Sequence, residues 1–146
     1  MTGAWQATGG AVSRVRHRVI FADTDALGIV YYGNYYKYFE IGRAEWFREH
    51  MEPFTVYIEQ DMYLIVVDSY CKHHAPARYD QVIRIETRVT RVKRASFRFE
   101  YEIRNDGTDE LLATGYTSHT VVGADGVLRR FDKDFLEKVK NLASDR

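Results

Sequence analysis

The chain of 146 residues is poor in several residue types, and each scarcity excludes a class of protein. Its one cysteine, Cys71, excludes an intramolecular disulfide and a metal site built from several thiolates, so nothing points to an oxidising compartment. Only two prolines are present, and no Pro/Gly-rich linker suggests a domain boundary. The longest apolar run, Met62 to Val67, falls far short of the roughly 18 residues that a membrane-spanning helix needs.

The charge is also balanced, with 21 basic and 21 acidic residues. This balance removes the global attraction to phosphates that nucleic-acid-binding proteins show, so we expect no nucleic-acid partner. Hydrophobic residues make up 45% of the chain, which is too many for a disordered protein. The first eleven residues lack the basic start and the apolar stretch of a signal peptide. We therefore expect a flexible tail over residues 1–11, a single domain over residues 12–146, and a cytoplasmic protein without an integral membrane segment.

Helical spacing dominates the segment from about Asn34 to Glu49. Apolar residues recur there every three or four positions, which predicts the longest helix of the chain. Asn34 is the expected N-cap, and Met51 to Pro53 should end the helix because the residue before a proline avoids the α region. The apolar face consists of Tyr35, Tyr38, Phe39, Gly42, Trp46 and Phe47. We expect Gly42 to be a packing contact.

Alternating apolar and polar residues predict antiparallel strands around this helix. The expected strands are Arg14–Phe21, Met62–Lys72, Gln81–Val92, Ser96–Arg104 and Leu111–Val122, with a hairpin turn at Asn105-Asp106-Gly107. Asp132 to Leu142 is expected to form a short helix, and Phe54 to Glu59 is ambiguous. One long helix followed by strands is an α+β pattern, in which a curved sheet wraps around the helix. The other sheet face carries charged residues, expected to be solvated or paired, and its edges could pair with another protomer.

The loop between the first strand and the long helix carries two carboxylates, Asp23 and Asp25. They lie just before a helix start, where free N–H groups carry partial positive charge, so a base or nucleophile and an oxyanion site could meet there. On spacing alone, however, aspartates in such loops are more often turn or cap residues.

The same loop resembles the 4-hydroxybenzoyl-CoA thioesterase family of the hotdog-fold superfamily, which includes acyl-CoA thioesterases associated with the Tol-Pal system. The resemblance depends on Arg18-Val19, Thr24-Asp25, Gly28-Ile29-Val30, Tyr32 and Tyr35, and it extends over about residues 12 to 130. It implies a hotdog fold, in which a curved antiparallel sheet surrounds one helix. It also implies a homodimer or homotetramer with sheets paired edge to edge and active sites at the interface.

Residue roles follow from this resemblance position by position. Asp25 matches the catalytic carboxylate, acting as nucleophile or general base, and Tyr32 matches the residue whose backbone N–H binds the thioester carbonyl. Lys93 and Arg94 match a basic pair that contacts the phosphates of coenzyme A, with Ser96 at the same strand start, although adjacent cations at a strand end are also typical of a solvated surface. Two roles come from position in the chain: Tyr31 is expected to line the substrate pocket, and Asp23 to form local hydrogen bonds.

The implied function is an acyl-CoA thioesterase that hydrolyses a small-molecule acyl-CoA to a free acid and coenzyme A without cofactor or metal. A non-catalytic sensor of acyl-CoA or acyl carrier protein is the main alternative, and a structural partner of a membrane-associated complex is a third. Histidine-based dehydration is disfavoured because the loop contains no histidine. His73 and His74 are consecutive on a strand, so we do not expect them to bind one metal. The remaining polar groups have structural explanations: His119 as a hydrogen-bonded strand histidine, and Glu40–Arg43 and Glu45–Arg48 as surface pairs.

Overall fold

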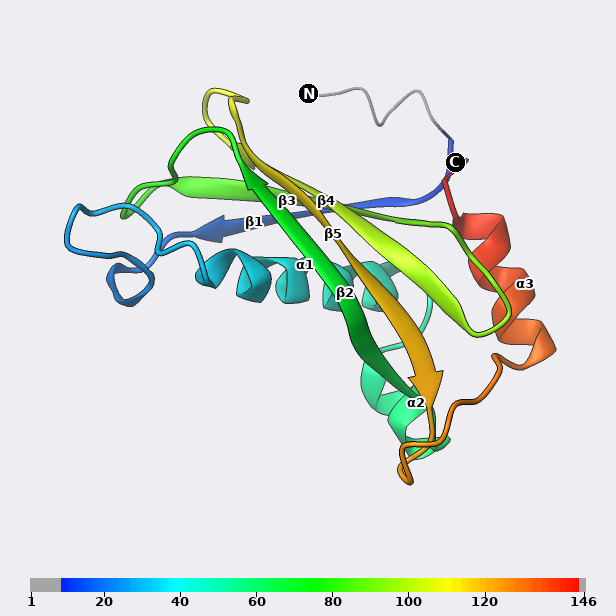
Figure 1. Cartoon of the computed structure of the whole chain (residues 1–146). Helices are drawn as coiled ribbons and strands as arrows, with labels where there is room; N and C mark the ends of the chain where they lie inside the picture. Colours follow the sequence, from blue (N-terminus) through cyan, green and yellow to red (C-terminus); the bar gives the residue numbers. More distant parts are fainter. Residues whose placement is uncertain (1–8, 145–146) are drawn as a thin grey trace.

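The computed structural model describes residues 9–144, which form one antiparallel sheet and three α-helices (Figure 1). In the sheet, the strand order is β1-β3-β4-β5-β2. The strands are β1 (Val12–Arg18), β2 (Tyr63–His73), β3 (Val82–Thr90), β4 (Ser96–Asn105) and β5 (Leu111–Val122). The helices are the 3-10 turn η2 (Phe21–Asp23), α1 (Asn34–His50), α2 (Phe54–Glu59) and α3 (Lys133–Leu142).

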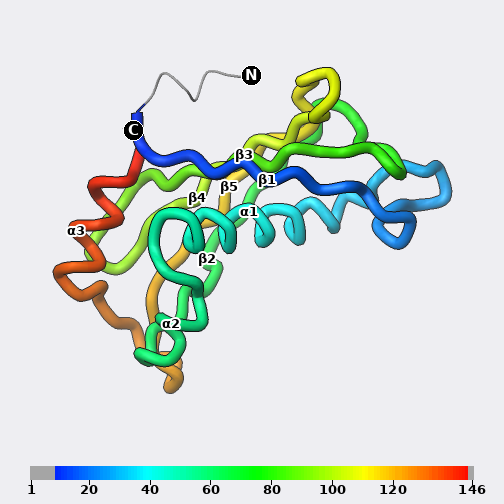
Figure 2. Tube along the Cα trace, turned by 180° about the vertical axis from the view of Figure 1, so that it is seen from behind, coloured from blue at the N-terminus to red at the C-terminus, as the bar shows by residue number. Residues whose placement is uncertain are grey.

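Helix α1 runs along one face of the curved sheet, as both views show (Figures 1 and 2). Its apolar face is buried against the sheet: Tyr38, Phe39, Trp46 and Phe47 have no exposed surface, and the Phe39 ring stacks on Tyr101 with centroids 4.2 Å apart. The prediction of an α+β fold with a curved sheet around one long helix is therefore confirmed.

Two glycines allow this close approach. A Cβ atom on Gly42 would lie 2.8 Å from the Ile85 Cγ2 atom and closer still to Thr87, and one on Gly115 would lie 2.7 Å from the Phe39 ring. Both distances are shorter than real Cβ contacts. The prediction that Gly42 is a packing contact is confirmed.

Two local predictions about the ends of elements are wrong. The N-cap of α1 is Gly33, and the Asn34 side chain instead donates to the backbone oxygen of Asp23 at 2.9 Å. The first strand ends at Arg18, because its partner β3 begins at Val82, directly opposite. Phe21, expected on the inner face of that strand, lies in η2 and is 71% exposed.

The ambiguous segment Phe54–Glu59 forms helix α2, which covers the end of the core beyond α1. Its Tyr57 ring packs between Phe47 and Phe135 with centroids 5.6 and 5.2 Å away. Asp132 caps α3 by accepting a hydrogen bond from the Phe135 N–H at 2.9 Å. The two short helices therefore close the same end of the sheet.

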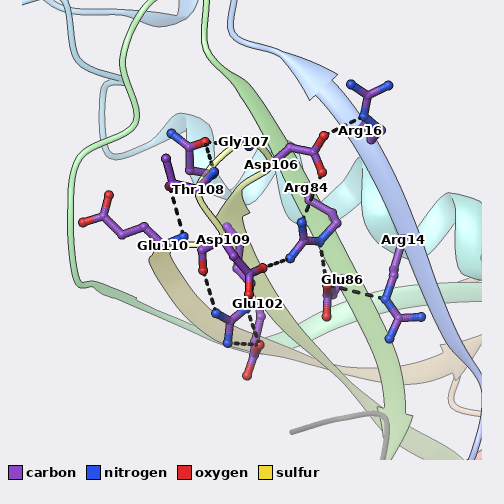
Figure 3. A network of polar contacts seen from close by, with 12 residues as sticks. Arg14, Arg16, Arg84, Glu86, Glu102, Asp106, Gly107, Thr108, Asp109 and Glu110 are labelled. Carbon is purple, nitrogen blue, oxygen red and sulfur yellow. Dashed lines mark hydrogen bonds and ion pairs between the residues drawn. The ribbon is translucent and has the colours of Figure 1, made fainter. Parts of the chain in front are cut away.

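The outer face of the sheet is covered by its own charged side chains (Figure 3). Glu86 at the centre of β3 is fully buried, and its Oε2 atom accepts from Arg84 Nε at 2.7 Å. Arg84 also contacts Asp109 and, at 3.1 Å, Asp106, which binds Arg16 at 2.8 Å. The charged side chains of this face therefore form ion pairs with one another, as the charge pattern allowed. Its central residues, however, are more deeply buried than alternation predicts.

The expected tail falls partly outside the described residues, which begin at Gly9. Within them, the Ala11 N–H donates to the Leu142 oxygen at 2.8 Å, and the Ala11 oxygen accepts from Trp46 Nε1 at 3.0 Å. The chain is thus packed against α1 and α3 before β1 begins. No helix between residues 9 and 144 is long and apolar enough to cross a membrane.

The contact of Gly42 with β3 predicts the effect of a single added methyl group. Gly42→Ala should lower the free energy of unfolding by about 1–3 kcal/mol, because overpacking outweighs the gain in helix propensity. Urea denaturation measures this change, with the exposed Arg48→Ala on the same helix as the control. Equal or greater stability of Gly42→Ala would show that α1 can move away from the sheet without cost.

Candidate active site

The loop between β1 and α1 is anchored by the buried carboxylate of Asp23, which is 3% exposed. The carboxylate accepts hydrogen bonds from Lys37 Nζ and, at 2.9 Å, from the Tyr38 hydroxyl, both on α1. Its backbone oxygen accepts from the Tyr31 N–H at 2.9 Å. Asp23 therefore joins both sides of the loop to the first turns of the helix, and the prediction that it forms local hydrogen bonds is confirmed.

Burial alone would raise the pKa of Asp23, but the hydrogen bonds from Lys37 and Tyr38 and the charge of Lys37 lower it below its ordinary value. The carboxylate is thus held in its ionised form. The same contact, together with burial, raises the pKa of the Tyr38 phenol. Both effects are typical of a structural carboxylate that is bound in its charged state.

Asp25 lies two residues further along, in a different environment. Its side chain is exposed, and its Oδ1 atom accepts from the Leu27 N–H at 2.8 Å. Its backbone N–H and oxygen bind Ile29 and Gly28 at 2.9 and 3.0 Å. Gly28 has a φ of 77°, a conformation that favours glycine. The turn therefore fixes one carboxylate oxygen, while Oδ2 makes no hydrogen bond within residues 9–144.

Asp25 lines a cavity of about 640 Å³ at the N-terminal end of α1. Tyr31, Tyr32 and Tyr35 form part of the same wall. Within residues 9–144, the backbone N–H of Tyr32 donates no hydrogen bond, whereas its oxygen accepts from the Tyr35 N–H at 3.2 Å. The structure thus brings Asp25, Tyr31 and Tyr32 together around one cavity, as expected from the sequence.

His73 and His74 also line this cavity, a placement that the sequence did not indicate. The His73 ring lies edge-on to Tyr35 with centroids 4.7 Å apart, and His74 Nε2 is 3.0 Å from Thr114 Oγ1. They reach the cavity because the segment after β2 binds the loop, where the Val30 N–H donates to the Ala77 oxygen at 2.8 Å. In the part of the chain that the structure describes, no cluster of three metal-ligating side chains is found.

Lys93, Arg94 and Ser96 lie elsewhere. Lys93 and Arg94 belong to the connection from β3 to β4, and Ser96 begins β4, at the end of the sheet far from the Asp25 loop (Figure 1). Lys93 and Ser96 line a separate cavity of about 200 Å³, and neither Lys93 nor Arg94 forms an ion pair within residues 9–144. One chain therefore does not bring these expected substrate-binding residues to Asp25.

Of the two ion pairs expected on the surface of α1, one is present among residues 9–144. Arg48 pairs with Glu45 at 3.4 Å, as predicted. No ion pair joins Glu40 to Arg43 among the described residues, so that prediction is wrong. The Arg43 guanidinium instead lies beside the hydroxyl of Tyr101 in the core.

Comparison with known proteins finds similarity to thioesterases. The model of the thioesterase superfamily matches residues 27–112, more than half of the chain. The chain is 32% identical over 88 residues to the acyl-CoA thioester hydrolase YbgC of Escherichia coli, covering 60% of this chain and 66% of that protein. A hypothetical protein from Aquifex aeolicus has a crystal structure with a TM-score of 0.81 and 30% identity, covering 87% of this chain and 98% of that one. A 1,4-dihydroxy-2-naphthoyl-CoA thioesterase from Synechocystis shares the fold, with a TM-score of 0.81 and 20% identity over 90% of this chain and 98% of its own.

The lowered pKa of Asp23 predicts how stability depends on pH. Its ionised form stabilises the folded chain above the pKa of the unfolded state, about 4, and this contribution is lost as the pH falls through the folded-state pKa. Asp23→Asn should therefore lower the unfolding free energy at pH 7 by roughly 1–3 kcal/mol, and the difference from wild type should shrink below pH 4.

Urea denaturation at a series of pH values measures this effect. Asp25→Asn, at an exposed position two residues away, is the matched control and should change stability by less than about 0.5 kcal/mol. A difference between Asp23→Asn and wild type that stays constant down to pH 2 would contradict the assignment.

Proposed function

Since the chain belongs to the thioesterase superfamily, we propose that it hydrolyses an acyl-CoA thioester to a free acid and coenzyme A at the cavity that Asp25 lines. One observation carries this proposal. Asp25, whose side chain is exposed, and Tyr32, whose backbone N–H donates no hydrogen bond within residues 9–144, line the same cavity directly before the N-terminus of α1. A negative group and an available hydrogen-bond donor on residues of one cavity support the proposal.

The proposed chemistry uses each group for one task. The thioester oxygen accepts from the Tyr32 N–H, and the positive end of the α1 dipole stabilises the negative charge that develops on this oxygen. Asp25 either attacks the carbonyl carbon, giving an acyl-aspartyl anhydride that water then hydrolyses to the free acid, or removes a proton from the water that attacks this carbon. The thiolate of coenzyme A leaves as the carbon–sulfur bond breaks, and it needs no strong acid because thiolates are only weakly basic.

A second chain is needed to bring Lys93 and Arg94 to this cavity, and the two sheet edges indicate how it would bind. The edge at β1 carries Arg14, Arg16 and Arg18, which oppose the approach of another strand. The edge at β2 exposes Ile65, Val66, Val67 and Tyr70, between 43 and 58% each. We therefore propose a dimer in which the two β2 strands pair.

Pairing about a two-fold axis would make these strands antiparallel. The start of β2 in one protomer would then lie beside the end of β2 in its partner. The Asp25 cavity is lined by His73 at the end of β2, whereas Ser96 pairs with Thr120, which faces Ile65 near its start. Such a dimer would combine Asp25 of one protomer with Lys93 and Arg94 of the other.

Asp25→Asn tests the proposed chemistry. The substitution keeps the size of the side chain and the acceptor for Leu27 but removes the charge, so kcat for acyl-CoA should fall roughly 10²-fold or more with the fold retained. Steady-state kinetics and circular dichroism measure the two effects. Tyr32→Phe, which preserves the backbone N–H, is the control and should change kcat only slightly. Wild-type turnover by Asp25→Asn would refute the site, and acyl-CoA binding without turnover by the wild type would favour a sensor.

The double variant Lys93→Ala/Arg94→Ala tests binding of the nucleotide. Loss of two charge-assisted phosphate contacts should raise KM for acyl-CoA roughly 10-fold or more, with little effect on a short thioester that lacks the nucleotide. Equal losses on both substrates would assign the pair a structural role.

A heterodimer tests whether the site is shared between chains. One Asp25→Asn chain and one double-variant chain, purified together with two different tags, would contain one intact site in a shared arrangement. Activity at low acyl-CoA concentration should then recover to about half of the wild-type value. Activity no higher than the mean of the two parents would place the whole site within one chain.

A further inference from the structure

A second cavity, of about 280 Å³, lies between α1, α2 and the start of β2. Most of its wall is apolar, with Phe54, Tyr57 and Leu64 among the lining residues. Arg43 and His119 also line it, and Glu40 lies on the same wall with an exposed side chain. An apolar cavity with few polar groups is typical of a site that binds a small molecule and fixes its orientation.

The polar side chains behind this wall form one hydrogen-bonded network. The hydroxyl of Tyr101 lies 2.7 Å from Thr117 Oγ1, which lies 2.8 Å from His119 Nε2. Arg43 lies beside the Tyr101 hydroxyl at the other end. All of these side chains except Arg43 are at least 98% buried. The prediction that His119 is a hydrogen-bonded strand histidine is confirmed.

The two titratable side chains of this network, Tyr101 and His119, are held in their neutral forms. Burial raises the pKa of Tyr101 to about 12, although the nearby Arg43 opposes this shift. Burial, together with the charge of Arg43, lowers the pKa of His119 to about 3. At neutral pH, the network behind the wall therefore consists of a phenol, an alcohol and an uncharged imidazole.

The direction of the hydrogen bonds follows from Arg43, which can only donate. Since the Tyr101 hydroxyl lies beside the guanidinium, we assign its oxygen as the acceptor from Arg43 and its proton to Thr117 Oγ1. Thr117 in turn donates to His119 Nε2. A neutral imidazole has one proton, which must then be on Nδ1. His119 Nδ1 is buried and has no hydrogen-bond partner within residues 9–144.

We propose that this cavity receives part of the acyl group, and that Arg43 and His119 select an acyl group with a hydroxyl or keto oxygen on an otherwise apolar body. This inference depends on the proposed thioesterase function. Arg43 and the Nδ1–H of His119 are both donors, so an oxygen that accepts hydrogen bonds would satisfy them. Glu40 on the same wall offsets the charge of Arg43, which favours a neutral oxygen over a carboxylate.

The proposed dimer would bring this cavity to the reacting carbonyl. It is lined by Tyr63, Leu64 and Ile65 at the start of β2, whereas the Asp25 cavity is lined by His73 at the end of that strand. Antiparallel pairing of two β2 strands would place the second cavity of one protomer next to the Asp25 cavity of the other. The acyl group would then extend from Asp25 into the partner.

A series of matched substrates tests whether the enzyme selects an oxygenated acyl group. Octanoyl-CoA is compared with octanoyl-CoAs that carry one hydroxyl or keto oxygen at successive carbons of the chain. The wild type should show a kcat/KM at least about 10-fold higher for one oxygenated position than for octanoyl-CoA, because a buried donor left unpaired disfavours the plain chain. Equal values at every position would overturn the inference and leave the thioesterase proposal intact.

Two variants then identify the donors. Arg43→Met and His119→Phe should each lower, roughly 10-fold, the ratio of kcat/KM for the preferred oxygenated substrate to kcat/KM for octanoyl-CoA, because the donor that pairs with the substrate oxygen and disfavours the plain chain is removed. Arg48→Met, an exposed position on the same helix outside the cavity, is the control for Arg43→Met. Equal losses on both substrates would show that these residues only support the fold.

If no acyl-CoA is hydrolysed by the wild type, the thioesterase proposal fails. Kd values measured by calorimetry for the same substrate pairs then test the selection of an oxygenated acyl group independently of turnover. A preference for the oxygenated chain that is lost in Arg43→Met supports the inference, and equal Kd values overturn it.

Discussion

Helix α1 can lie directly on the sheet because Gly42 and Gly115 present no side chains where the two surfaces meet. This contact fixes the position of the helix N-terminus relative to the end of β2. The loop before α1 is then held at that point by the buried carboxylate of Asp23. As a result, Asp25 and the Tyr32 N–H are positioned by the helix and by the hydrogen bonds of the turn, although both lie in a loop.

The order of elements could be predicted from the sequence because one face of each element is buried. Helical spacing identified the residues of α1, and alternation identified the strand β4, on which Phe97, Phe99 and Tyr101 are buried. The resemblance of the loop to the 4-hydroxybenzoyl-CoA thioesterase family likewise pointed to a site at Asp25. These features depend on local periodicity and on residues close together in the chain.

Other features depend on contacts between distant segments, so periodicity could not predict them. Alternation assigns Glu86 to the outer face but does not show that Arg84 and its neighbours bury it completely. The presence of His73 beside Tyr35 depends on how the segment after β2 binds the loop. The separation of Lys93 from Asp25 follows from the length of β3, which carries the chain to the far end of the sheet.

The arginines of β1 bear on how far the sheet could extend if two chains pair as proposed. A strand that exposes Ile65, Val66 and Val67 could in principle start sheet growth from one molecule to the next. Continued growth would require the opposite edge to accept a strand, which would strip water from Arg14, Arg16 and Arg18. In the proposed dimer, a two-fold pair of β2 strands would leave only these cationic edges at both ends of the combined sheet. Addition of strands would then stop at two chains, which would protect a protein with an apolar sheet edge from forming fibres.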